Sequence, residues 1–143
     1  MILVDTNVIS EFMTSPPDDR VRQWLNRQET SNLFLPSIAI AEITFGLGVM
    51  PDGRRRNLLG DRFEQFLALV FAGRILPFHE PEARIYGELR ARRQAAGQPI
   101  SNFDAQIGAI ARSRGLALAT CNVKDFAGCD LELINPWETD QAP

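Results

Sequence analysis

Short apolar runs alternate along the chain with longer segments in which apolar residues recur at helical spacing. The runs at 2–4, 33–35, 74–78, 116–120 and 131–134 predict short strands. Helices are predicted after Asp5, after Asp18, and over 37–47, 58–71, 81–96 and 101–114. The strands lack polar alternation, which is typical of parallel strands covered on both faces. We therefore expect an α/β fold, a three-layer α/β/α sandwich around a mainly parallel sheet of four to five strands, in a single domain over residues 1–143.

The composition is that of a globular protein with a substantial core. Hydrophobic residues make up 45% of the chain and charged residues 23%. No run approaches the roughly 20 apolar residues of a membrane span. Asp5 interrupts the N-terminal apolar run, so we expect a cytoplasmic protein without a signal peptide or membrane contact. Cys121 and Cys129 lack the spacing and His partners of a zinc site, and we expect two reduced thiols.

The charge pattern leaves nucleic-acid binding open. A net charge of −3 argues against a protein whose whole surface binds nucleic acid. A carboxylate site, however, counts as negative until a metal ion neutralises it. Fourteen of the 15 basic residues are Arg, and six of these form two clusters, at 54–56 and at 90, 92 and 93. Such clusters either contact phosphate or simply form solvated surfaces.

Three acids are expected near the carboxyl ends of the predicted strands, where the functional sites of parallel sheets lie. Asp5 directly follows the first strand, and Asp104 begins the helix before the fourth. Glu42 interrupts an otherwise apolar segment, 38–43. Polar residues also follow the fourth strand: Thr120, Asn122 and Asp125.

Each acid alone has an ordinary structural explanation. Asp5 is a good helix cap, Ser101-x-x-Asp104 resembles a capping box, and Glu42 could face solvent. Together they favour another explanation, because a buried carboxylate costs several kcal/mol unless it is paired or bound to metal. Few cations accompany these acids, and we assign no role to the single histidine, His79. The pattern therefore indicates a Mg²⁺ or Mn²⁺ site able to hydrolyse a phosphodiester.

Two other site types fit the sequence poorly. No G-x-G-x-x-G follows the first strand, which argues against a dinucleotide site. Gly46 and Gly48 are instead expected to allow close packing of their helix. A receiver-like phosphoacceptor site would need paired acids after the first strand and a Lys at the end of a late strand; here Asp5 stands alone and Lys124 lies in a loop.

The order and spacing of several motifs resemble the PIN-domain family, and within it the VapC toxins of bacterial toxin–antitoxin pairs and the similar FitB proteins. The resemblance covers essentially the whole chain. It is carried by MILVDTNVISE, AEITFG, AGRILPF, SNFDAQIGAIA, ALATCNVKDF and INPWE.

The resemblance implies a Mg²⁺- or Mn²⁺-dependent ribonuclease. Asp5 and Asp104 would be the main metal ligands, with Glu42 as a third ligand or as the group that orients water. Thr6, Asn7 and Thr120 would support the site. FitB-like members carry a fourth acid at the position of Asn122, so either Asp125 replaces it or the site has three acids, and the number of metal ions stays open.

The resemblance also implies partners. VapC-like proteins form homodimers and bind a small VapB-type antitoxin, which covers the acidic groove and supplies contact with operator DNA in a higher assembly. The alternative function is a FitB-like subunit of a DNA-binding regulatory complex with little or no nuclease activity. The RNA that is cut, and the identity of the antitoxin, do not follow from the sequence.

Overall fold

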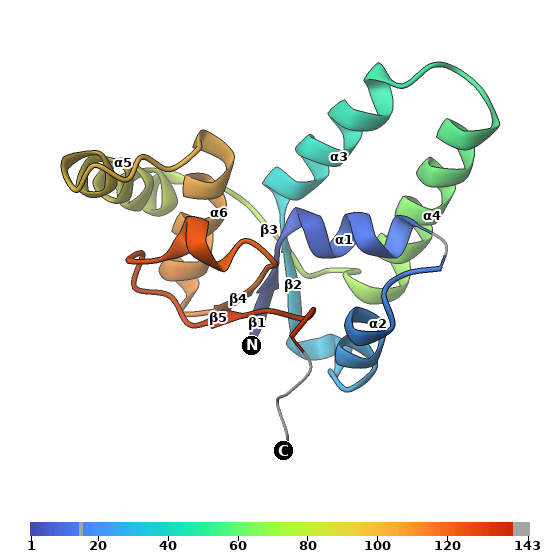
Figure 1. Ribbon diagram of the computed structural model, residues 1–143, viewed down its shortest axis with the longest axis horizontal. Helices are drawn as coiled ribbons and strands as arrows, with labels where there is room; N and C mark the ends of the chain where they lie inside the picture. Colours follow the sequence, from blue (N-terminus) through green and yellow to red (C-terminus); the bar gives the residue numbers. More distant parts are fainter. Residues whose placement is uncertain (15, 139–143) are drawn as a thin grey trace.

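The computed structural model describes residues 1–14 and 16–138, so residues 139–143 of the expected domain lie outside the described residues. All strand pairs in the five-stranded sheet are parallel, in the order β3-β2-β1-β4-β5 (Figure 1). The strands are β1 (Ile2–Val4), β2 (Leu33–Pro36), β3 (Ile75–Leu76), β4 (Ala117–Ala119) and β5 (Leu133–Ile134). The predicted parallel α/β architecture is confirmed.

Helices cover both faces of the sheet. They are α1 (Thr6–Met13), α2 (Asp19–Asn26), α3 (Ser37–Val49), α4 (Arg54–Val70), α5 (Glu80–Ala95) and α6 (Asn102–Arg114), with short 3₁₀ turns η1 (Thr30–Asn32) and η2 (Val123–Phe126). Figure 1 shows α5 and α6 on one side of the strands and α1, α2 and α4 on the other. Successive strand residues point to opposite faces, so Leu3 packs in the core under α5 and α6 while Val4 packs in the core under α1 and α4. The predicted three layers are present.

Some element boundaries differ from the prediction. Helix α4 begins at Arg54 rather than residue 58, because arginines are good helix formers and Gly53 directly precedes them. Strand β3 is limited to two residues, since Gly73 lies in a left-handed turn before it and Pro77 has no N–H to donate after it. The two 3₁₀ turns were not expected from the apolar pattern.

The far end of α3 leaves the sheet and projects, together with α4, away from the rest of the molecule (Figure 1). Phe45 is 72% exposed and Val49 is 67% exposed. A Cβ atom added at Gly46 or Gly48 would meet no atom within 4 Å apart from its chain neighbours and the backbone of its own helix. The expectation that these glycines pack closely is therefore wrong within the described residues. No helix in the described part of the chain is both long and apolar enough to cross a membrane.

The open surroundings of Gly48 predict the effect of adding a methyl group there. Gly48→Ala should stabilise the isolated chain by about 1 kcal/mol, because alanine favours the helix and nothing obstructs its side chain. Gly115→Ala is the matched control: Gly115 caps α6 with a φ of +65°, so alanine should destabilise by about 1 kcal/mol. Urea unfolding measures both changes, and destabilisation by Gly48→Ala would contradict the open environment.

Candidate active site at the carboxyl ends of β1 and β4

A pocket of about 410 Å³ opens where β1 and β4 end. Asp5 ends β1 and begins α1, Glu42 comes from α3, Asp104 from α6, and Asn122 from the turn after β4. Four elements distant in sequence thus contribute to one concave site. The complete lining is Asp5, Thr6, Asn7, Ser10, Glu11, Thr14, Glu42, Asp104 and Asn122.

Asp5 is the most buried acid of this pocket, with 3% of its surface exposed. Its Oδ1 accepts a hydrogen bond from the Thr6 backbone N–H at 2.7 Å, so it caps α1 as expected. Its Oδ2 accepts from Thr120 Oγ1 at 2.7 Å and from Asn7 Nδ2 at 3.0 Å. Burial raises the pKa of Asp5 to about 6, against the opposing effect of the hydrogen bonds from Thr120 and Thr6. These hydrogen bonds fix the position of the carboxylate, and within residues 1–14 and 16–138 it has no cationic side chain as a partner.

Glu42 is connected to Asp5 through Thr6. The Thr6 hydroxyl donates to Glu42 Oε1 at 2.8 Å, while the Thr6 backbone N–H binds Asp5. Partial burial raises the pKa of Glu42, and the nearby charge of Asp104 raises it further. Glu42 therefore faces the pocket instead of lying free in solvent.

Asp104 lies in the first turn of α6. Its backbone N–H donates to Ser101 Oγ at 3.2 Å, so Ser101 caps the helix as the capping pattern predicted. The Asp104 carboxylate lines the pocket. Its pKa is raised by partial burial and by the negative charge of Asp125.

The segment after β4 closes the remaining side. Thr120 Oγ1 accepts from Asn7 Nδ2 at 3.1 Å and from the Asn122 backbone N–H at 3.0 Å. Asn7 Oδ1 in turn accepts from the Cys121 backbone N–H at 3.3 Å. The side chain that lines the pocket here is Asn122, whereas Asp125 is exposed outside the lining and acts on Asp104 through its charge.

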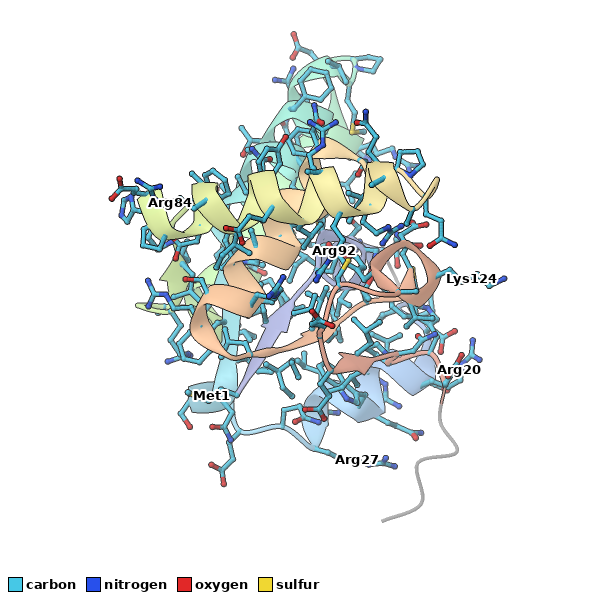
Figure 2. The ribbon with its side chains drawn as sticks, turned by 90° about the vertical axis from the view of Figure 1, so that its left-hand side faces the viewer. Met1, Arg20, Arg27, Arg84, Arg92 and Lys124 are labelled. Carbon is cyan, nitrogen blue, oxygen red and sulfur yellow. The ribbon has the colours of Figure 1, made fainter. Side chains whose placement is uncertain are left out.

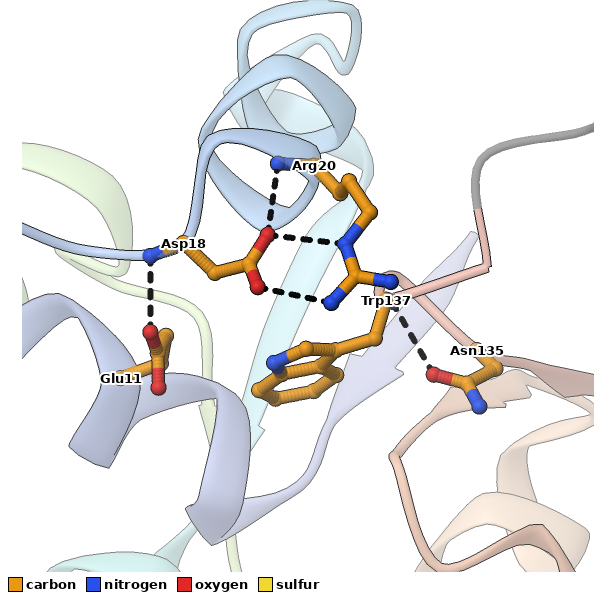
Figure 3. A network of polar contacts seen from close by, with 5 residues as sticks. All are labelled: Glu11, Asp18, Arg20, Asn135 and Trp137. Carbon is orange, nitrogen blue, oxygen red and sulfur yellow. Dashed lines mark hydrogen bonds and ion pairs between the residues drawn. The ribbon is translucent and has the colours of Figure 1, made fainter.

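Glu11 is a pocket residue that the sequence reasoning missed. It lies one helical turn after Asn7, and this i, i+4 spacing was the available signal. Figure 3 shows one of its carboxylate oxygens accepting the backbone N–H of Asp18, at 2.7 Å. Asp18 caps α2 and also binds Arg20, below which Trp137 lies in Figure 3. Glu11 thus connects the pocket wall to the start of α2.

The residues of the pocket suit a hydrated divalent cation that prefers oxygen ligands. Carboxylate, hydroxyl and amide oxygens are the ligands that Mg²⁺ and Mn²⁺ prefer. The burial of Asp5 without a cationic partner is a second observation in favour of such an ion. Within residues 1–14 and 16–138, however, no group of three or more acidic, His or Cys side chains is placed so that it could hold a metal ion by itself. An ion bound in this pocket would therefore need water or substrate oxygens to complete its ligands, as Mg²⁺ commonly does.

The fold and the acidic pocket together define the class of this protein. Residues 2–128 match the PIN domain, and the chain therefore belongs to the PIN-domain family.

Within this family the chain is similar to bacterial toxins. Toxin FitB of Neisseria gonorrhoeae is 39% identical over 137 residues, covering 96% of this chain and 99% of that protein. VapC ribonuclease Y4jK of Sinorhizobium fredii is 40% identical over 138 residues, with the same coverage of 96% and 99%. A chain in the structure of FitAB bound to the IR36 DNA fragment is 37% identical and matches with a TM-score of 0.90 over 100% of both chains.

The raised pKa of Asp5 predicts how pH changes the stability of the metal-free protein. Asp5 binds its proton more tightly when folded, so its ionisation destabilises the fold as pH rises from about 4 to about 6. Relative to wild type, Asp5→Asn should gain up to about 3 kcal/mol in unfolding free energy between about pH 4 and about pH 7.

Urea unfolding in EDTA at a series of pH values measures this difference. The matched control is Asp61→Asn, which removes an exposed carboxylate from α4. A constant difference between Asp5→Asn and wild type across this pH range would contradict the expected burial of an unpaired charge.

Proposed function

We propose that this protein is a Mg²⁺- or Mn²⁺-dependent endoribonuclease and the toxin of a VapBC-type toxin–antitoxin pair. The observation that carries the proposal is the pocket in which Asp5, Glu42 and Asp104 converge without a cationic partner. Similarity to a VapC ribonuclease over 96% of the chain supports the same activity. We take the whole chain, residues 1–143, as one PIN domain that acts in the cytoplasm.

In this proposal the acids hold the metal and the polar neighbours hold the acids. Asp5 and Asp104 are the main ligands, and Glu42 completes the triad. The bound ion would supply charge stabilisation at the phosphodiester and a more acidic water. Thr120 and Asn7 orient the Asp5 carboxylate, and Thr6 orients Glu42. Asn122 can offer its side-chain amide to a phosphate oxygen, and Asp125 contributes negative charge at the rim.

The proposed antitoxin has a suitable surface beside the acids. An adjoining groove of about 390 Å³ between α1, α3 and α4 shares Thr6 and Glu42 with the acidic pocket. Its floor is mostly apolar, and Arg55 lines its edge. An amphipathic antitoxin segment would bury its apolar side there and place a basic residue among the acids. A FitAB complex solved with a DNA fragment, and a VapBC2 complex from Rickettsia felis solved with a fragment of its promoter, support contact with operator DNA through the antitoxin. The assembly in this proposal is built on a toxin homodimer.

One observation favours a second function. Asn122 stands in the pocket where an acid would strengthen metal binding. The chain would then be a FitB-like subunit of a DNA-binding regulatory complex, with little or no nuclease activity. Similarity to the FitAB chain solved with DNA supports this alternative.

Cleavage of RNA by the purified, antitoxin-free protein distinguishes the two functions. We expect discrete fragments in Mg²⁺ or Mn²⁺ that disappear in EDTA. Asp5→Asn and Asp104→Asn should each lower the rate by about 100-fold or more, because each removes a charge that stabilises the reaction. Asp61→Asn, an exposed acid on α4, should cleave like wild type.

Failure to cleave a broad RNA panel, by folded protein that still binds Mn²⁺, would contradict the nuclease and favour the regulatory subunit. Cleavage that survives in both site variants would contradict the acidic site itself.

Asn122→Asp tests whether this position limits metal binding. A fourth carboxylate in the pocket should tighten Mn²⁺ binding by roughly tenfold, because affinity rises with the number of charged ligands. Asn102→Asp is the matched control, since it adds the same charge at an exposed position outside the pocket lining. Calorimetric titration measures the Mn²⁺ affinity of both variants. Equal gains in affinity would contradict a ligand role for residue 122 and show that the added charge acts only through long-range electrostatics.

A further inference from the structure

Arg93 of α5 is a buried cation that the proposed mechanism does not use. Only 7% of its surface is exposed. Among residues 1–14 and 16–138 it forms no ion pair, in contrast to its neighbour Arg92, which pairs with Asp130 at 3.2 Å. A buried charge is retained only where hydrogen bonds compensate its desolvation.

The partners of Arg93 are backbone carbonyls on two segments that flank the acidic pocket. Its Nη1 donates to the carbonyls of Asp125 and Ala127, both at 2.9 Å, and lies 3.4 Å from Cys129 Sγ. Its Nε donates to the Gln98 carbonyl at 2.7 Å, three residues before the cap of α6. Figure 2 shows the C-terminal half of α5, marked by Arg92, beside the turn that carries Lys124.

A continuous series of hydrogen bonds leads from Arg93 to Asp5. Arg93 donates to the Asp125 carbonyl, and the Asp125 N–H donates to the Asn122 carbonyl at 3.0 Å. The Asn122 N–H donates to Thr120 Oγ1 at 3.0 Å, and Thr120 donates to Asp5 Oδ2 at 2.7 Å. Every donor points from the cation toward the anion, and the links at Asp125 and Asn122 pass through their Cα atoms, so the series fixes the position of this segment.

We propose that Arg93 is a positioning residue of the active site: by fixing the η2 turn against α5 and the start of α6, it holds Asn122 at the pocket wall and Thr120 on Asp5. The proposal rests on the proposed function because it takes this pocket as the working site. Arginine suits the role because its rigid planar fork binds several carbonyls at once, which the single ammonium of lysine does not reproduce. A purely structural Arg93 would satisfy the same carbonyls without any coupling to Asn122.

A double-mutant cycle separates these roles. Arg93→Lys keeps the charge but loses the fork, and it should lower Mn²⁺ affinity and kcat/KM for RNA about tenfold, as loss of a supporting partner typically does. Asn122→Ala, which removes the amide offered to phosphate, should lower kcat/KM by a similar factor. Because part of the effect of Arg93 reaches the pocket through the Asn122 side chain, the double variant should lose clearly less kcat/KM than the about 100-fold product of two independent effects. Arg92→Met, at the exposed neighbouring position, should stay within about twofold of wild type.

Hydrogen exchange supplies a readout independent of RNA cleavage. In Arg93→Lys the amides of residues 122–127 should exchange faster, while those of β1 keep their protection and show that the core is folded. Additive losses in the double variant, or unchanged Mn²⁺ affinity with lowered stability alone, would overturn the proposal. If wild type cleaves no RNA, the proposed function fails, and the Mn²⁺ and exchange measurements still decide the role of Arg93.

Discussion

The site depends on the burial of one carboxylate, that of Asp5, at the point where β1 becomes α1. Its backbone N–H donates to the Ala119 carbonyl at 2.9 Å, so the sheet register between β1 and β4 fixes where the side chain begins. Donors from three positions then fix where its oxygens lie: the Thr6 backbone, the Asn7 amide and the Thr120 hydroxyl. The fold tolerates an ionised group without a cationic partner because these donors replace part of the lost water.

The sequence predicts the strands and the main acids for the same physical reason. Parallel strands buried on both faces leave short apolar runs, and the residue that follows each run must lie at the carboxyl edge of the sheet. This reasoning located β1, β2 and β4 within one or two residues and placed Asp5 at the pocket. Glu42 was marked by its isolation in an apolar helix, and it does face the pocket.

Features that depend on distant contacts could not be predicted in this way. The role of Arg93 arises from carbonyls up to 34 residues away, so in the sequence it looked like one member of a charged cluster. Whether Asn122 or Asp125 faces the pocket depends on the conformation of the η2 turn. The spacing of apolar residues along the chain does not predict that conformation. The environment of Gly46 and Gly48 depends on where α3 leaves the sheet, and composition carries no signal for that.

The acidic pocket and the apolar groove share Thr6, Ser10, Thr14 and Glu42, so neither surface can be occupied without affecting the other. A segment seated in the groove lies against the same Glu42 that Thr6 holds toward Asp5. Burial, and then the charge of Asp104, raises the pKa of Glu42; a basic residue on that segment would lower this pKa and would lower the demand for a metal ion. Under the proposed function, inhibition by a bound partner would need no conformational change in this fold, because the partner would compete with the metal ion for the same carboxylates.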